Sequence, residues 1–199
     1  MKKYLKMLSF ALVFTFVPAV VFASPADDKM IEEQTQFIQK NADDVVAYLK
    51  RGDAYRREGK YDLAIADETT AIEKKHDYAA AYASRASCYS RMKNYEAAIK
   101  DDTKAIELQP RYPLPYLNRA IAYLSTGKND LALADCDKYL EIDPTQARVY
   151  FIKGLIYEKI NKNDEAIATY KKIFEVRMTA DSKIIMDAKN KIVMLGGSI

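Results

Sequence analysis

Tryptophan is absent from this sequence, histidine occurs once, as His76, and glycine and proline occur only six times each. So few turn-forming residues argue against a many-stranded fold, whereas the abundance of alanine, lysine, glutamate, leucine and isoleucine favours helices. The sequence has no glycine-rich phosphate-binding loop, and no residue stands at a spacing that would build a catalytic triad or a metal site with His76. We therefore expect an all-α protein that has no enzymatic activity and needs neither a metal nor another cofactor.

The first 23 residues differ in composition from the rest of the chain. Lys2, Lys3 and Lys6 precede an uncharged and almost wholly apolar run at residues 7–22, and Ala23 follows. This pattern is typical of a secretory signal peptide that is cleaved after Ala23. An uncleaved membrane anchor is the alternative, but the apolar run is short for a full membrane span. We therefore expect an exported, periplasmic protein.

Removing the signal peptide makes the chain formally neutral. The segment holds three of the 31 lysines and arginines, and all 28 aspartates and glutamates follow it, so basic and acidic residues become equal in number. No basic tail or stripe remains that would displace counterions from a phosphate backbone. We therefore expect no binding to nucleic acids.

Tyrosines recur along the chain with a period of 34 residues. One set consists of Tyr48, Tyr82, Tyr116 and Tyr150, and a second set, seven residues later, consists of Tyr55, Tyr89, Tyr123 and Tyr157. A fold with one copy of each element has no reason to space residues in this way, so the sequence indicates four repeated units. Within the first unit Tyr48 and Tyr55 share one helical face, and Ala64 and Ala71 mark a second helix beyond the polar turn at residues 58–60. Each unit is therefore predicted to be a helix–turn–helix.

Small residues occupy two positions of every unit where helices must approach closely. They are Gly52, Ala86, Ala120 and Gly154 in the first helix and Ala64, Ala98, Ala132 and Ala166 in the second. Together with the tyrosines, they resemble the pattern of the tetratricopeptide repeat. The resemblance implies an α-α superhelix, a solenoid of four helix–turn–helix repeats at residues 45–78, 79–112, 113–146 and 147–180.

One further helix is expected on each side of the repeats, because residues 28–40 and 184–195 carry apolar side chains at helical spacing. The N-terminal helix, within residues 24–44, should cover the first hairpin, and the C-terminal helix, within residues 181–199, should cap the last one. The C-terminal helix carries several lysines and could instead lie on a membrane. Because the last apolar face of a stacked array needs a cover, we favour a cap and expect no membrane association apart from the signal peptide.

The chain departs from the family pattern at two charged positions. Where the family has leucine the first three units have Arg51, Arg85 and Arg119, and sixteen residues later they have Asp67, Asp101 and Asp135. Positions sixteen apart can face each other across an antiparallel hairpin, and the guanidinium fork matches a carboxylate. We predict bidentate ion pairs that hold the hairpins together and are not ligand sites. The fourth unit has Lys153 and Thr169 at these positions.

The two cysteines, Cys88 and Cys136, could form a disulfide if the protein is exported. The resemblance implies that Cys136 packs toward the unit that follows it, away from the unit that holds Cys88. We therefore favour two buried thiols over a disulfide. His76 falls in a turn between units, and we interpret it as a solvated turn residue.

Members of the family line a concave groove with the first helix of each unit. The positions that point into it are polar and basic in the first two units and mostly apolar in the last two. The candidate binding residues are Leu49, Asp53, Arg56, Arg57, Ser87 and Arg91 in the first half and Leu117, Ile121, Leu124, Phe151 and Leu155 in the second; Ala83, Ser90, Leu114, Arg148 and Glu158 also fall at these positions. Since an exposed apolar patch usually marks an interface, we expect a partner to place apolar side chains on the second half and acidic groups near Arg56, Arg57 and Arg91.

Two alternatives remain for the apolar half of the groove. The C-terminal helix could fold back over it, or two copies could pack through it to form a structural homo-oligomer. The family's clamp of Lys, Asn and Arg around a terminal dicarboxylate is not present, because Leu49 and Asp53 stand where Lys and Asn would be required. We therefore expect a protein–protein interaction module or scaffold of the cell envelope, whose partner is a protein or peptide.

Overall fold

The computed structural model describes residues 24–176 and 180–198. The predicted signal peptide at residues 1–23 lies outside the described residues. Within the described ranges the chain forms ten α-helices and no strands. They are α1 (Pro25–Lys40), α2 (Val45–Arg57), α3 (Tyr61–Lys74), α4 (Ala79–Arg91), α5 (Tyr95–Leu108), α6 (Pro113–Ser125), α7 (Asn129–Ile142), α8 (Ala147–Lys159), α9 (Asn163–Glu175) and α10 (Ser182–Met194).

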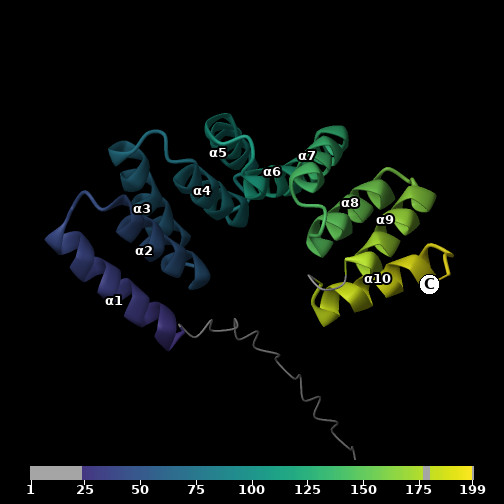
Figure 1. Cartoon of the computed structure of the whole chain (residues 1–199), viewed down its shortest axis with the longest axis horizontal. Helices are drawn as coiled ribbons and strands as arrows, with labels where there is room; N and C mark the ends of the chain where they lie inside the picture. Colours follow the sequence, from purple (N-terminus) through teal and green to yellow (C-terminus); the bar gives the residue numbers. More distant parts are fainter. Residues whose placement is uncertain (1–23, 177–179, 199) are drawn as a thin grey trace, which may run out of the picture.

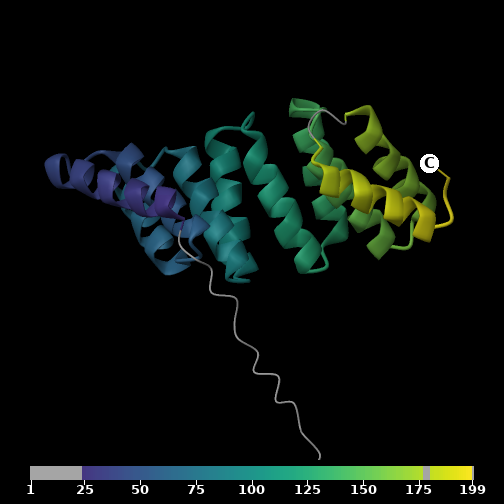
Figure 2. The ribbon, with the colours of Figure 1, turned by 90° about the horizontal axis from the view of Figure 1, so that it is seen from below.

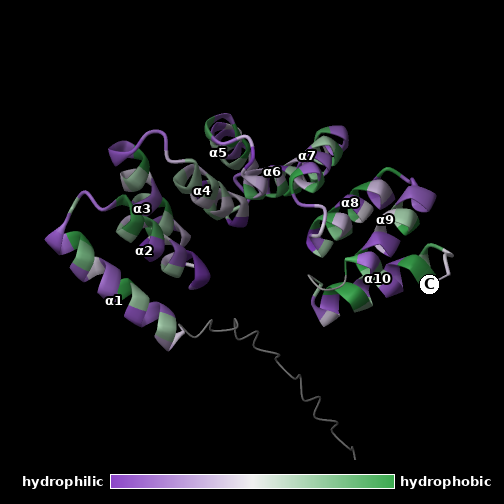
Figure 3. Ribbon diagram, viewed as in Figure 1, coloured by the Kyte–Doolittle hydropathy of each residue, from purple (hydrophilic) through white to green (hydrophobic). Residues whose placement is uncertain are grey.

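The helices pack in chain order along an arch, which confirms the predicted solenoid of helical hairpins (Figure 1). The first helices of the four units, α2, α4, α6 and α8, lie along the inner side of the arch, and α3, α5, α7 and α9 lie along the outer side. Seen from the inner side, α1 and α10 lie at opposite ends (Figure 2). Most helices carry both hydrophobic and hydrophilic residues (Figure 3), as expected for helices that bury one face.

The turn inside each hairpin has the same backbone geometry in all four units. A residue with positive φ follows the first helix at a step of 34: Gly59 (φ 75°), Lys93 (62°), Gly127 (77°) and Asn161 (60°). The next residue donates its backbone N–H to a carbonyl five residues back, as Lys60 does to Tyr55 (2.9 Å), which closes a helix C-terminus of the Schellman type. Glycine adopts this conformation without strain, whereas Lys93 must be held in it by the flanking helices.

The predicted ion pairs are present and bidentate in all three hairpins. Arg85, for example, donates from Nε to Oδ2 of Asp101 at 2.7 Å and from Nη2 to Oδ1 at 2.9 Å. The sequence analysis did not anticipate that the third nitrogen, Nη1, donates to the hydroxyl of Thr69 on the outer helix of the preceding unit, at 3.0 Å. Corresponding contacts, each spanning sixteen residues, join Arg51 to Asp67 and Thr35, and Arg119 to Asp135 and Thr103.

The fourth unit replaces this arrangement with a simpler one. Lys153 donates to Asp137 on the preceding unit. Within the hairpin, Gly154 allows the ring of Tyr170 to pack directly against α8: an added Cβ would lie 2.6 Å from its Cζ. This hairpin is therefore held by close apolar packing where the others have an ion pair.

The flanking helices cap the array as expected. Thr35 places α1 in the phase of an outer helix, bound to Arg51 of the first hairpin. At the other end Ala188 and Ile192 of α10 are fully buried in a cluster with Tyr170 and Ile173 of α9. The apolar face of the last hairpin is thus covered by α10.

The two cysteines are free and fully buried, as favoured from the sequence. Burial raises the pKa of both thiols, that of Cys136 to about 12. His76 is exposed in the turn between α3 and α4, which confirms the interpretation of a solvated turn residue.

Candidate binding groove

The inner side of the arch carries two adjoining hollows. The first, of about 560 Å³, is lined by residues of α2, α4, α6 and α8 and so extends over all four units. The second, of about 260 Å³, lies against α4, α6 and α8. Four residues line both hollows: Ser87, Arg91, Asn118 and Arg148. We call the two hollows together the groove.

Six of the eleven candidate residues line the groove. Leu49, Asp53, Arg56, Ser87 and Arg91 line the first hollow, and Ile121 lines the second. Eight lining residues were not among the predicted positions: Val46, Lys50, Ser84 and Asn118 within the inner helices, and Tyr78, Tyr95, Tyr112 and Ser125 at or next to helix ends. Lys50, Ser84 and Asn118 each follow a predicted position directly, one turn beyond the second position of a unit, so a broader helical face would have included them.

The predicted apolar half of the groove is less exposed than expected. Leu117 is only 5% exposed and belongs to the core between α7 and α8, and Ile121 and Leu124 pack against that core. The ring of Phe151 packs on Tyr170, with 5.5 Å between the centroids, in the cluster that α10 completes. Leu155 is half-buried and lines neither hollow.

The physical reason is that these side chains pack on other helices. Leu117 packs with residues of α7 and α8, and Phe151 packs on Tyr170 of α9. Of the surface offered for the alternative of a homo-oligomer, Leu117 is therefore in the core and the other four residues are half-buried.

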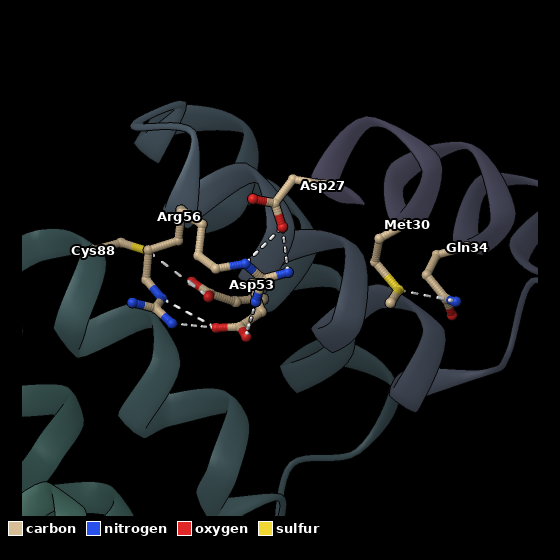
Figure 4. Close-up of polar contacts among 8 residues, drawn as sticks. Asp27, Met30, Gln34, Asp53, Arg56 and Cys88 are labelled. Carbon is tan, nitrogen blue, oxygen red and sulfur yellow. Dashed lines mark hydrogen bonds and ion pairs between the residues drawn. The ribbon is translucent and has the colours of Figure 1, made fainter. Parts of the chain in front are cut away.

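At the predicted basic end of the groove, two of the arginines are paired with carboxylates. Arg56 and Arg57 both bind the carboxylate of Asp53, and Arg57 binds Asp27 of α1 as well, with 2.6 Å between Nη2 and Oδ1. Figure 4 shows Arg56 directed at Asp53, and both residues line the first hollow. Two carboxylates thus neutralise both arginines, which leaves them little charge to offer a ligand.

Buried carboxyl groups lie beneath the groove, at a position that sequence reasoning overlooked. Glu68 and Asp102 are fully buried, and each follows the aspartate of an ion pair by one residue. Burial raises the pKa of Glu68 to about 8 and that of Asp102 well above its ordinary value. The thiol of Cys88 donates to Oε1 of Glu68 at 3.8 Å. The signal was present in the sequence, since the same position holds Cys136 and Tyr170 in the later units, which implies a neutral environment.

Neither a metal cluster nor a membrane span is found in the part of the chain that the structure describes. No group of three or more His, Cys, Asp or Glu side chains gathers there in a way that could hold a metal ion. None of the helices in the same ranges is both long and apolar enough to cross a membrane.

Comparison with known proteins identifies the family. The model of the tetratricopeptide repeat matches residues 45–73, 79–112, 115–146 and 147–177. The crystal structure of MamA is 28% identical, with a TM-score of 0.69 and with 76% of this chain and 89% of that chain covered. A search of curated proteins gave no match.

Two further solved structures have the same fold. The thermophilic TPR protein TTC0263 of Thermus thermophilus has a TM-score of 0.72 at 20% identity, over 84% of this chain and 91% of that one. The first TPR domain of Spaghetti (RPAP3), bound to the HSP90 peptide SRMEEVD, has a TM-score of 0.57 at 26% identity, over 59% and 93%. Because the family model matches more than half of its length, this chain belongs to the tetratricopeptide repeat family.

Proposed function

We propose that this protein is a binding module or scaffold that holds a segment of a partner protein in the groove. The observation that carries the proposal is the first hollow, which runs over the inner helices of all four units and has both apolar and charged lining residues. Concave sites with this mixture are typical of ligand binding, and four helices can contact several side chains of one extended or helical segment. The related fold in RPAP3 is bound to a peptide.

The test is site-specific cross-linking from inside and outside the groove. A photoreactive phenylalanine analogue would replace Ser87, which lines both hollows, or Lys104, which is exposed on the outer helix α5. Cells that express either variant are irradiated, and the adducts are compared by mass. We expect one discrete partner adduct from Ser87 and none of that mass from Lys104. The same adduct from both positions, or none from Ser87, would contradict the proposal.

We further propose that the protein acts in the cell envelope after export. The support is the basic start, the apolar run and the Ala23 site of the first 23 residues. Cell fractionation followed by N-terminal sequencing tests this directly. We expect a mature chain that begins at Ser24 in the periplasmic fraction; an intact chain in the cytosol would overturn the assignment.

A further inference from the structure

Two arginines converge on the junction of the hollows. Arg91 is the last residue of α4 and Arg148 lies in the first turn of α8, so they come from units two and four. Both line both hollows, and both are exposed. Among the described residues neither forms an ion pair, in contrast to Arg56 and Arg57 at the other end of the groove. Two like charges directed at one small space repel each other unless an anion lies between them.

The lining around these arginines offers them no counter-charge. Asp53 is the only carboxylate among the residues that line the first hollow, and it is bound to Arg56 and Arg57. No carboxylate lines the second hollow. The lining of the groove therefore leaves Arg91, Arg148 and Lys50 without compensation, a positive field in a chain whose predicted mature form is neutral.

Neutral hydrogen-bond donors stand beside the arginines. Ser87 and Asn118 line both hollows, and Ser90 lines the second. The hydroxyl of Ser90 is buried and makes no hydrogen bond among the described residues, whereas the side-chain amide of Asn118 faces the buried carboxyl of Asp102. Buried donors without an acceptor are costly, so a bound oxyanion that supplied one would recover that free energy.

The first hollow also has apolar lining residues. Val46 is 45% exposed and Leu114 is 43% exposed, and Leu49, Tyr78 and Tyr112 line the same space. A ligand that filled the hollow would therefore contact aliphatic and aromatic side chains as well as arginines.

Building on the proposed function, we propose that the partner segment is acidic and aliphatic, with a carboxylate held between Arg91 and Arg148 and its apolar neighbours against Val46, Leu49 and Leu114. The guanidinium groups match carboxylate oxygens, and the hydroxyls of Ser87 and Ser90 donate the remaining hydrogen bonds. A protein partner fits better than a nucleic acid. A phosphate backbone requires cations spaced along a track, whereas here two arginines line the same pair of hollows together with apolar side chains.

The experiment uses the mature protein and a library of ten-residue peptides randomised among Asp, Glu, Asn, Gln, Leu, Val and Ala. The library is synthesised with free and with amidated C-termini. Immobilised protein is incubated with it, and the retained peptides are sequenced. The variant carries Arg91→Gln and Arg148→Gln together. The matched control is Arg111→Gln, which removes an exposed arginine that lines neither hollow.

We expect Asp and Glu to be enriched over Asn and Gln by about tenfold in the wild type and in the control, because charge-assisted hydrogen bonds carry that much free energy. The double variant should lose this enrichment. Enrichment in both forms of the library indicates side-chain carboxylates, and enrichment only with free C-termini indicates the terminal carboxylate; either supports the inference.

Retention of peptides without acidic enrichment, or enrichment that persists in the double variant, would overturn the inference and leave the proposed function standing. An increase in the salt sensitivity of binding in the double variant would likewise count against it, since removing the two charges must reduce that sensitivity. If the wild type retains no peptide of either library, both the inference and the proposed function fail.

Discussion

Single residues that contact three helices at once are the main polar connections of this protein. Each of Arg51, Arg85 and Arg119 joins the inner helix that carries it, the outer helix of its own unit and the outer helix of the unit before. Such a contact requires the three donors of a guanidinium group in fixed directions. A lysine could satisfy only part of it.

The first prediction concerns this difference between arginine and lysine. Arg85→Lys should lower the free energy of unfolding by about 1–3 kcal/mol, because Asp101 stays buried and loses its bidentate partner. Urea denaturation measures the change. Arg91→Lys, at an exposed position without an ion pair, serves as the control and should change stability by less than about 0.5 kcal/mol. Equal effects of the two substitutions would remove the structural role assigned to Arg85.

The second prediction concerns pH. Glu68 has an ordinary pKa of 4.5, and burial raises it to about 8 in the folded chain. The folded state therefore binds this proton more tightly than the unfolded state does. The stabilisation is fully present below pH 4.5 and is lost as the pH rises toward 8, by at most about 1.4 kcal/mol per pH unit. Glu68→Gln should reduce this slope, as measured by urea denaturation from pH 5 to pH 8.

The control for that experiment is Glu73→Gln, an exposed glutamate on the same helix. It should leave the pH dependence as in the wild type. A slope that is unchanged in Glu68→Gln would mean that Glu68 titrates in the folded chain as it does in the unfolded one.

Some contacts of these residues could be predicted from the sequence and others could not. The ion pairs could be predicted, because arginines and aspartates sixteen residues apart recur in three units and their side chains match in charge and shape. The third contact, to Thr69 and its equivalents, depends on how closely one unit packs on the next, which the period alone does not specify. The buried Glu68 was missed for a different reason: charged residues in helices are usually solvated, although the equivalent positions of later units hold Cys136 and Tyr170.

At the scale of the helical pair, one position decides how closely the two helices approach. Gly52 and Gly154 are equivalent, but their surroundings differ. A Cβ at Gly52 would meet the carbonyl oxygen of Ala64 at 3.4 Å, close to an ordinary contact. A Cβ at Gly154 would overlap the ring of Tyr170, which is fully buried and cannot move aside.

The third prediction compares Gly52 with Gly154. Gly154→Ala should destabilise the protein by about 1–3 kcal/mol, because the fourth hairpin must open to admit the methyl group. Gly52→Ala should change stability by no more than about 1 kcal/mol, since the helical preference of alanine offsets a tight contact. Thermal and urea unfolding of the two variants give the comparison. A larger loss in Gly52→Ala would contradict the packing described for α8 and α9.

The positions of the helices could be predicted because each hairpin repeats the same turn, small residues and tyrosines. The exposure of individual side chains to solvent could not be predicted. The same positions along α2 and α6 are open in one unit and buried in another, as Leu49 and Leu117 show. Which of them faces solvent depends on the angle between successive units, and the repeat pattern contains no information about that angle.

At the scale of the whole molecule, the protein is a row of units that contact mainly their neighbours. Stability in such a row is a sum of local terms, so a defect at one end should affect that end most. The C-terminal end depends on α10, where Ile192 is fully buried and the adjacent Val193 is 62% exposed.

The fourth prediction uses those two residues. Ile192→Ala should destabilise the C-terminal end by about 2–5 kcal/mol, and Val193→Ala should change it by less than about 0.5 kcal/mol. Hydrogen exchange read by mass spectrometry should show faster exchange in α8, α9 and α10 of Ile192→Ala, with α2 and α3 unchanged. Uniformly faster exchange along the chain would indicate a single cooperative unit.

The arginines that each contact three helices also determine how the arch responds to force. A displacement of one outer helix is passed through Arg51, Arg85 or Arg119 to the hairpin that follows, so the first three units should deform together as one elastic body. The fourth unit has no such arginine and is tied to the unit before it by the single ion pair of Lys153 with Asp137. Under tension applied at the two ends, we expect the arch to lengthen first between α7 and α8, which would draw Arg148 of α8 away from Arg91.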